Sequence, residues 1–563
     1  MKGGMLRRSF WLLPLLLAML AAHKEIGENE KELEMDGIVM EGHEEEVKPK
    51  DLTAAIFLLG GVTFVMSLFY LVNHPDMDIR DHTWKVINAT VSIFVSVLLF
   101  QGITGVSDRV SDTFISDQSH QSLAKICFAY FTFLLFYCAL HGVLYNLAFS
   151  TDEAPKLERK STSFWTLLPA RSTIIASEDG TFETKRKRKI ACWATLLSHM
   201  AGFAHIRCSL DLQQLEVFKV GVMAIVPTII NALLLVVIFK LSDSFRRRFE
   251  QKPASKGFHL WEMGAEEAED DIAAIGISFS SVVVLRYTFT KQMANVLGLE
   301  LPVVDHAMYA KIAIGCATLI FALISILILV CLTKFRSPKK GQGYERAQEG
   351  QESEGRFSII EDSARKDYLT RWILIASSTF ATAASWCGLY ASKWFLYGLE
   401  IKEDEDTNPN SCISRVILAL LVSFGSFVMI YFLDKLSDLE STDDDADHAI
   451  EEVIHAIGVS VGFAWEQAFD AGVETIGERT ESLGKWYPVW ARLGFALMIS
   501  AVMIPAWRLY LIKRSLEKHV QCKKKNKESA SGGTNRCEAV LVIDAKHCHM
   551  CGLKIEDDAE RSP

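Results

Sequence analysis

The sequence lacks the signatures of several large protein classes. Its 563 residues carry a formal net charge of −10 and contain no basic domain, so nothing in the chain predicts nucleic-acid binding. A phosphate-binding glycine loop, a metalloprotease HExxH sequence and a nucleophile elbow are all absent from the sequence. We therefore do not expect an enzyme, and no cofactor is predicted.

A disulfide framework is also missing. Most of the 12 cysteines lie within apolar stretches or in the C-terminal tail. Small secreted domains instead place an even number of cysteines in polar, loop-rich sequence. The cysteine pattern therefore excludes a disulfide-stapled secreted domain.

What the chain does have is apolar sequence in long runs. The composition is 50% hydrophobic with a mean hydropathy of +0.18. Runs of about 20 apolar residues are long enough to cross the hydrocarbon core of a bilayer. The sequence predicts an all-α, polytopic transmembrane protein whose first partner is the lipid bilayer. About eleven spans are expected, at 52–73, 84–105, 123–148, 190–208, 217–240, 270–290, 308–333, 370–396, 412–433, 449–473 and 487–512.

The N-terminus resembles a secretory signal. Lys2, Arg7 and Arg8 precede the apolar run FWLLPLLLAMLAA, which ends in small residues. An uncleaved signal anchor is the alternative. Either version places the acidic segment that follows on the lumenal or extracellular side, in a membrane of the secretory pathway.

Loop charges test this orientation. The loops predicted to be cytoplasmic contain basic runs such as ETKRKRK (183–189) and FRRRFEQK (245–252), whereas the outer loop 401–411 is acidic. This distribution follows the positive-inside rule and places the C-terminus in the cytoplasm. The acidic inner loop 434–447 is an exception.

The second and third parts of the membrane region look duplicated. Residues 186–208 align with 365–387 without a gap, and 267–278 align with 449–460. A unit of four spans returns the chain to its starting side, so the two copies are predicted to be parallel.

The predicted organisation is therefore three N-terminal spans followed by a tandem repeat of four-helix units. In order, the segments are a signal peptide (1–22), an acidic outer segment (23–51), a three-helix unit (52–150), a basic cytoplasmic loop (151–189), repeat A (190–334), a polar linker (335–367), repeat B (368–513) and a cytoplasmic tail (514–563).

The span at 449–473 carries an unusual number of ionisable residues. On a helix of 3.6 residues per turn, these side chains lie within about 60° of His455 and form one stripe. Ionisable side chains inside a membrane are costly and usually face a bundle interior or a water-filled cavity. The stripe is therefore the candidate pathway for an ion or a polar solute. Its members are Glu451, Glu452, His455, Glu466 and Asp470.

Structural explanations for the stripe remain open. Glu451 and Glu452 suit the positive end of a helix dipole in any first turn. The apolar stretch could also end at Phe463, in which case 464–476 would protrude as a polar helix. Gly458 and Gly462 are spaced to let another helix pack closely.

The C-terminal tail contains a cluster of potential zinc ligands. Thiolates and imidazoles at short spacing can bind zinc tetrahedrally, but only Cys548 and Cys551 form a clear pair. A reduced, unstructured tail is the competing interpretation. The candidate metal ligands are Cys537, His547, Cys548 and Cys551.

Two functional hypotheses follow. The first is a transporter or channel for a cation, a proton or a small polar solute, with Glu466 and Asp470 as the central residues. The second is a membrane scaffold or receptor-like protein whose charged helix pairs with a helix of a partner. The sequence sets neither the solute nor the oligomeric state, and a homo-oligomer is compatible with it.

Overall fold

The structure is a computed structural model in which most membrane-region residues are described. The described residues are 49–74, 76–115, 118–149, 182–219, 221–248, 256–295, 298, 300, 305–336, 368–403, 412–437, 444–480, 484, 486–512, 519–521 and 540–542. The predicted signal peptide and nearly all of the C-terminal tail lie outside these ranges.

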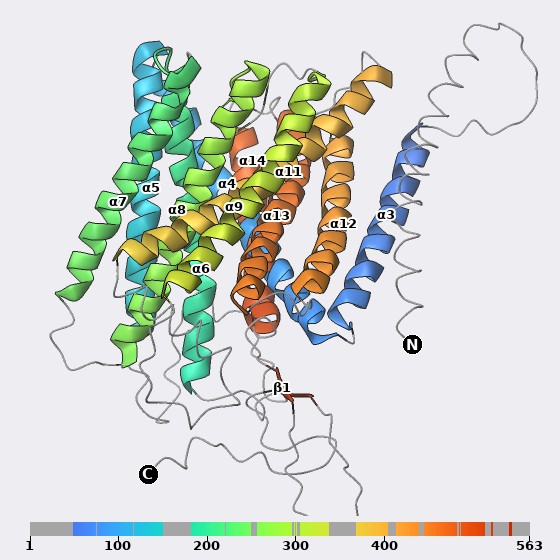
Figure 1. Cartoon of the computed structure of the whole chain (residues 1–563). Coiled ribbons are helices and arrows are strands. Elements are labelled where there is room, and N and C mark those ends of the chain that lie inside the picture. The colour runs from blue at the N-terminus through green and yellow to red at the C-terminus, as the bar shows by residue number, and fades with distance from the viewer. Residues whose placement is uncertain are drawn as a thin grey trace, which may run out of the picture.

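Within this part of the chain, eleven long helices form one bundle (Figure 1). Successive helices run in opposite directions, and we call the end at which α4 begins the lower end. The helices are α3 (Pro49–Val72), α4 (Met77–Phe114), α5 (Gln118–Phe149), α6 (Phe182–Gln213), α7 (Val226–Arg247), α8 (Lys256–Thr290), α9 (Met308–Arg336), α11 (Tyr368–Glu403), α12 (Cys412–Ser437), α13 (Asp444–Thr480) and α14 (Tyr487–Ala506).

Short elements extend this helical frame. A 3₁₀ turn, η2 (Gly221–Ile225), precedes α7, and a π-helical turn, η4 (Trp507–Leu511), continues α14. Two three-residue strands, β1 (His519–Gln521) and β2 (Val540–Val542), pair antiparallel below the bundle. The fold is therefore all-helical apart from this small ribbon.

Eight helical stretches in the described part of the chain are long and apolar enough to cross a membrane. They belong to α4, α5, α7, α8, α9, α11, α12 and α14, which identifies an integral membrane protein. The other long helices, α3, α6 and α13, do not meet the same criterion over their described residues. The acids of α13 and the basic start of α6 reduce their apolar length.

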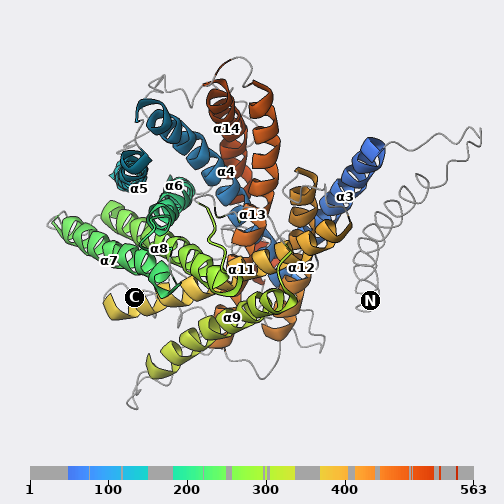
Figure 2. The ribbon, with the colours of Figure 1, turned by 90° about the horizontal axis from the view of Figure 1, so that it is seen from above.

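The centre of the bundle is built around α4, α8 and α13. Helix α6 packs against α4 and α8, and α11 packs against α8 and α13. Helices α5, α9 and α14 contact this centre from outside, on α8, α13 and α4 respectively. In Figure 2 the helix α3 lies at the edge of the bundle, where Phe64 packs on Phe424, Phe427 and Trp465.

A buried ionic network ties α5, α7, α8 and α11 together. The carboxylate of Glu269 is fully buried and accepts hydrogen bonds from Arg246 Nη1 at 2.7 Å, Arg371 Nη2 at 2.9 Å and the Tyr137 hydroxyl at 2.7 Å. Arg371 Nη2 also donates to Asp270 at 2.6 Å. Each charge in this network is matched, so it acts as a structural clamp between four helices.

Candidate functional site

Helix α13, which carries the predicted charged stripe, lies close against α4. A Cβ atom added at Gly458 would be 3.0 Å from Ala89 Cβ, and one added at Gly462 would be 3.0 Å from Thr90 Cα. Glycine is required at both positions because a side chain would push the two helices apart. This close approach brings the next turn of α13 next to the second half of α4.

Glu466 lies one turn beyond Gly462, in the interior of the bundle. Only 1% of its surface is exposed, and neither carboxyl oxygen has a hydrogen-bond partner among the described residues. The Gln101 side chain of α4 is close to the carboxyl group, but not in hydrogen-bonding geometry. Glu466 is therefore a buried acid that the surrounding protein does not neutralise.

Burial without partners is costly for a carboxylate. An isolated ionised carboxylate in a medium of low dielectric is so unfavourable that such a group normally binds a proton or is paired with a cation. An amide or alanine at position 466 would avoid this cost. The geometry at Glu466 thus suits a proton or a cation that binds and leaves.

Asp470 lies one turn above Glu466 and is less enclosed. Its side chain is 24% exposed, and Arg415 Nη1 of α12 lies 3.9 Å from its Oδ2 atom. The same Nη1 atom donates to the backbone carbonyl of Gln467 at 3.3 Å. Asp470 therefore contacts both a guanidinium group and the more open upper part of the bundle.

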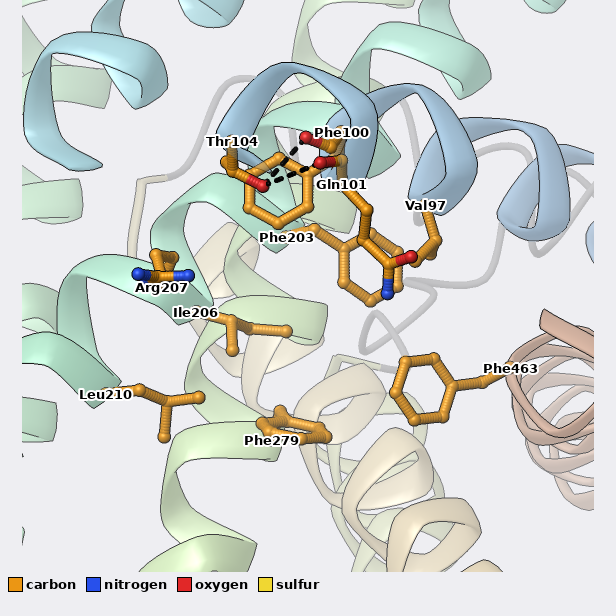
Figure 3. Close-up of a pocket in the computed structure, with 10 residues that line it drawn as sticks. All are labelled: Val97, Phe100, Gln101, Thr104, Phe203, Ile206, Arg207, Leu210, Phe279 and Phe463. Carbon is orange, nitrogen blue, oxygen red and sulfur yellow. Dashed lines mark hydrogen bonds between the residues drawn. The ribbon is translucent and has the colours of Figure 1, made fainter. Parts of the chain in front are cut away.

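A cavity of about 60 Å³ lies between α4, α6, α8 and α13, on the side of Gln101 (Figure 3). This volume has room for a few water molecules. Its polar groups are the amide of Gln101, the hydroxyl of Thr104 and the guanidinium of Arg207. The lining residues are Val97, Phe100, Gln101, Thr104, Phe203, Ile206, Arg207, Leu210, Phe279 and Phe463.

Arg207 is held at the edge of this cavity by two acids. Its Nε atom donates to both oxygens of Asp211 at 3.0 Å, and its Nη2 atom donates to Asp108 Oδ1 at 3.0 Å. The guanidinium charge is therefore compensated within the protein. This leaves Gln101 as the cavity residue next to the uncompensated Glu466.

Aromatic rings close the bundle below the cavity. The Phe203 and Phe463 rings stack at 6.0 Å, and the Trp386 ring lies 4.8 Å from that of Phe463 and 4.9 Å from that of Phe279. Trp386 Nε1 donates to the Ser278 hydroxyl at 3.1 Å, which fixes the indole. This cluster separates the cavity from the lower half of the bundle.

His455, another member of the predicted stripe, does not share the surroundings of Glu466. His455 is exposed, and it lies within electrostatic range of the buried His199 of α6. Glu451 and Glu452 are part of α13, but their side chains are outside the described residues. The stripe therefore includes both buried and open positions.

The predicted zinc ligands in the tail cannot be placed. Cys537, His547, Cys548 and Cys551 all lie outside the described residues. Among the residues that the structure does describe, no group of three or more histidine, cysteine, aspartate or glutamate side chains could bind a metal ion. A metal site in the tail stays a prediction.

Sequence reasoning did not find three residues of the upper half of the bundle: Gln101, Lys393 and Arg415. Gln101 is a single amide in an apolar run of α4, and the two cations lie near the ends of predicted spans. The only signal for them was polarity within or beside apolar sequence. Their roles depend on which helix faces which, and sequence periodicity does not give that information.

Comparisons of the chain with known proteins find no relative: no protein-family model, no curated protein and no solved structure matches it.

Proposed function

We propose that this membrane protein is a transporter or channel that moves a proton or a small cation through the bundle by way of Glu466. The observation that carries the proposal is the burial of this carboxyl group without a hydrogen-bond partner in the described structure. A permanent structural acid would be paired, as Glu269 is with Arg246 and Arg371. Glu466 instead has the environment of a site whose partner comes and goes.

The route that we infer starts at the upper end of the bundle. The ion reaches Asp470 and the cavity, passes Gln101, and binds at Glu466. The aromatic cluster around Phe463 blocks further passage in the conformation described. Movement of this cluster would open the way to His455 and to Glu451 and Glu452 at the start of α13.

A proton fits this route better than a hydrated metal ion. Near Glu466 the polar groups are one amide, a second carboxyl group and the Arg415 guanidinium. Their oxygens are too few to replace the oxygen shell of a cation that needs six or more ligands. A carboxyl group takes up a proton without any further ligand. Glu466 is therefore assigned as the carrier of the proton and Asp470 as the group that exchanges it with water.

The architecture proposed for this function has eleven spans. The eleven helices overlap the eleven apolar segments of the sequence, and the contacts of α6 with α8 and of α7 with α8 recur as those of α11 with α13 and of α12 with α13. This recurrence supports two parallel four-helix units that follow three N-terminal helices. The basic loops at the lower end support a cytoplasmic C-terminus in a membrane of the secretory pathway.

Proton flux into liposomes tests the assignment. The purified full chain is reconstituted with a pH-sensitive dye inside, and a potassium gradient with valinomycin sets the membrane potential. Glu466→Gln is expected to abolish flux and Asp470→Asn to reduce it. The matched control is Glu474→Gln, because Glu474 lies on the same helix but has a side chain that is 44% exposed.

The outcomes separate the competing assignments. Flux that is unchanged in Glu466→Gln would refute the role of this carboxyl group. The wild-type protein could instead carry sodium or potassium and no protons. If Glu466→Gln loses that flux, the transported ion is reassigned. No flux in the wild-type protein would favour a scaffold or receptor-like protein, in which α13 pairs with a partner helix.

A further inference from the structure

Two cationic side chains are buried near the upper ends of α11 and α12. Lys393 and Arg415 are each only 6% exposed. They come from consecutive helices that contact each other. Buried cations are normally paired with acids, so the acids near these two side chains decide whether their charges are compensated.

Lys393 has no such partner. Its ammonium group makes no hydrogen bond or ion pair with any residue that the structure describes, and its one polar contact is with the face of the Tyr397 ring, whose centroid lies 5.4 Å away. Arg286 and Arg415 are both close enough to repel the ammonium group. The nearest acid, Glu300, is already bound by Arg286 at 2.9 Å and His306 at 2.8 Å.

Arg415 is only partly compensated. Its Nε atom is buried without a hydrogen-bond partner in the described part of the chain, and the acid that forms an ion pair with it, Asp470, lies 3.9 Å from Nη1. Arg415 also lies in the first turn of α12, which begins at Cys412. The N-terminal end of a helix carries a partial positive charge and free N–H groups, so a cation there is unfavourable and an anion is favourable.

With Glu466 protonated, as in the proposed function on which this count rests, the described side chains leave one positive charge in excess. Lys393 and Arg415 contribute two positive charges and Asp470 one negative charge, and the Arg286–Glu300 pair is neutral. We propose that Lys393, Arg415 and the N-terminus of α12 form a binding site for one small monovalent anion, of which chloride is the probe. The anion accepts hydrogen bonds from the Lys393 ammonium and the free Arg415 Nε–H, and it balances the excess charge.

The site is restricted to a small anion by its burial. Both side chains are more than nine-tenths buried, and the cavity beside Gln101 lies between other helices. A large carboxylate or a phosphate ester would require the helices to separate. A single halide ion is the smallest ligand that could accept hydrogen bonds from both side chains.

Thermal unfolding of the full chain in detergent tests the site. Sodium gluconate is replaced by sodium chloride at constant ionic strength, and the unfolding temperature is followed. The wild-type protein is expected to show a saturable rise, because a ligand that binds only the folded state stabilises it. In Lys393→Gln the apparent affinity for chloride should fall by about tenfold or more, since a hydrogen bond to an ion is lost.

The matched control is Lys311→Gln. Lys311 is equally buried, but its ammonium group donates to Asp305 at 2.6 Å, so this variant should keep the chloride response. Lys393→Arg, which keeps the charge, should also keep it. Should Lys393→Gln fail to fold, the linewidth of the chloride-35 NMR signal reports binding to the wild-type protein, and displacement by bromide shows that the site saturates.

Some results would overturn the proposal. These are a wild-type unfolding temperature that does not depend on chloride, a chloride-35 linewidth that bromide does not change, and a response in Lys393→Gln equal to that of the wild type. The two proposals can be told apart, because Glu466→Gln, which is uncharged like the protonated acid, should lose flux and keep the chloride response. Each idea can therefore fail while the other stands.

Discussion

Replacement of Glu269 by glutamine should destabilise this protein more than most single substitutions. The Glu269 carboxylate accepts two hydrogen bonds from Arg246, at 2.7 and 3.2 Å, and one from Arg371 at 2.9 Å. Glutamine keeps the shape but removes the negative charge, and its amide would face donors only. Arg246, which is 1% exposed, would then be a buried guanidinium without its hydrogen-bonded counter-charge.

The magnitude follows from this geometry. Removal of one partner from a buried ion pair costs about 3–5 kcal/mol, because the other charge stays buried. Asp270 keeps its contact with Arg371 at 2.6 Å, so only part of the network is lost. We therefore expect a loss of about 3 kcal/mol in the free energy of unfolding of Glu269→Gln.

The measurement is thermal or denaturant unfolding of the full chain in detergent micelles. Glu267→Gln, on the exposed face of the same helix, should change stability by less than about 0.5 kcal/mol. The double variant with Arg246→Gln should lose less stability than the sum of the two single losses, because it removes both charges of one pair. A Glu269→Gln protein as stable as the Glu267→Gln control would refute the reasoning.

Three further predictions concern other parts of the bundle. Gly458→Leu should separate α13 from α4 and cost about 1–3 kcal/mol of stability, measured by the same unfolding assay. Burial alone would raise the pKa of Glu300, but the nearby Arg286 guanidinium and a histidine lower it from 4.5 to about 2. The stability from this pair is therefore fully present above pH 4.5 and lost as the pH falls towards 2, and Glu300→Gln should remove that part of the pH dependence. Asn231→Leu should cost about 1–3 kcal/mol in unfolding experiments, because the Asn231 amide donates to the Pro227 carbonyl at 3.0 Å.

Helix positions could be predicted well because they depend on local apolar length. Each of the eleven expected segments overlaps one long helix, although whether all of them cross the bilayer stays a prediction. The ends were less well predicted. Helix α8 starts at Lys256 instead of residue 270, because its first turns are polar and helical, and apolar length does not detect such turns.

The candidate site could be predicted only in part. Glu466 was detectable because an acid in an apolar helix is costly wherever that helix packs. Its neighbour Gln101 was not, since the close packing of α4 on α13 at the two glycines cannot be read from either segment alone. The prediction of the stripe also assumed that all residues on one face of the helix have the same surroundings. In the structure, the neighbours of α13 change along its length, so Glu466 is buried while His455 is exposed.

The buried charges of this bundle are of two kinds: those hydrogen-bonded to an opposite charge and those without such a partner among the described residues. Glu269 and Glu300 are buried acids whose cations are within hydrogen-bonding distance, and both hold helices or a connecting segment in place. Glu466 is 1% exposed, and its carboxyl oxygens have no hydrogen-bond partner among the described residues. Lys393 is 6% exposed, and its polar contact within the described structure is the face of the Tyr397 ring. Packing does not require a charge at either position, since an apolar side chain of similar size would cost less.

The two unpaired charges are also connected. Arg415 of α12 lies within electrostatic range of both Glu466 of α13 and Lys393 of α11. An anion beside Lys393 and Arg415 would reduce the positive potential felt by Glu466, which favours the protonated or cation-bound form of that carboxyl group. By linkage, a proton or cation at Glu466 would favour the anion to the same extent. The arrangement of charges therefore favours uptake of two ions of opposite sign together over uptake of either one alone.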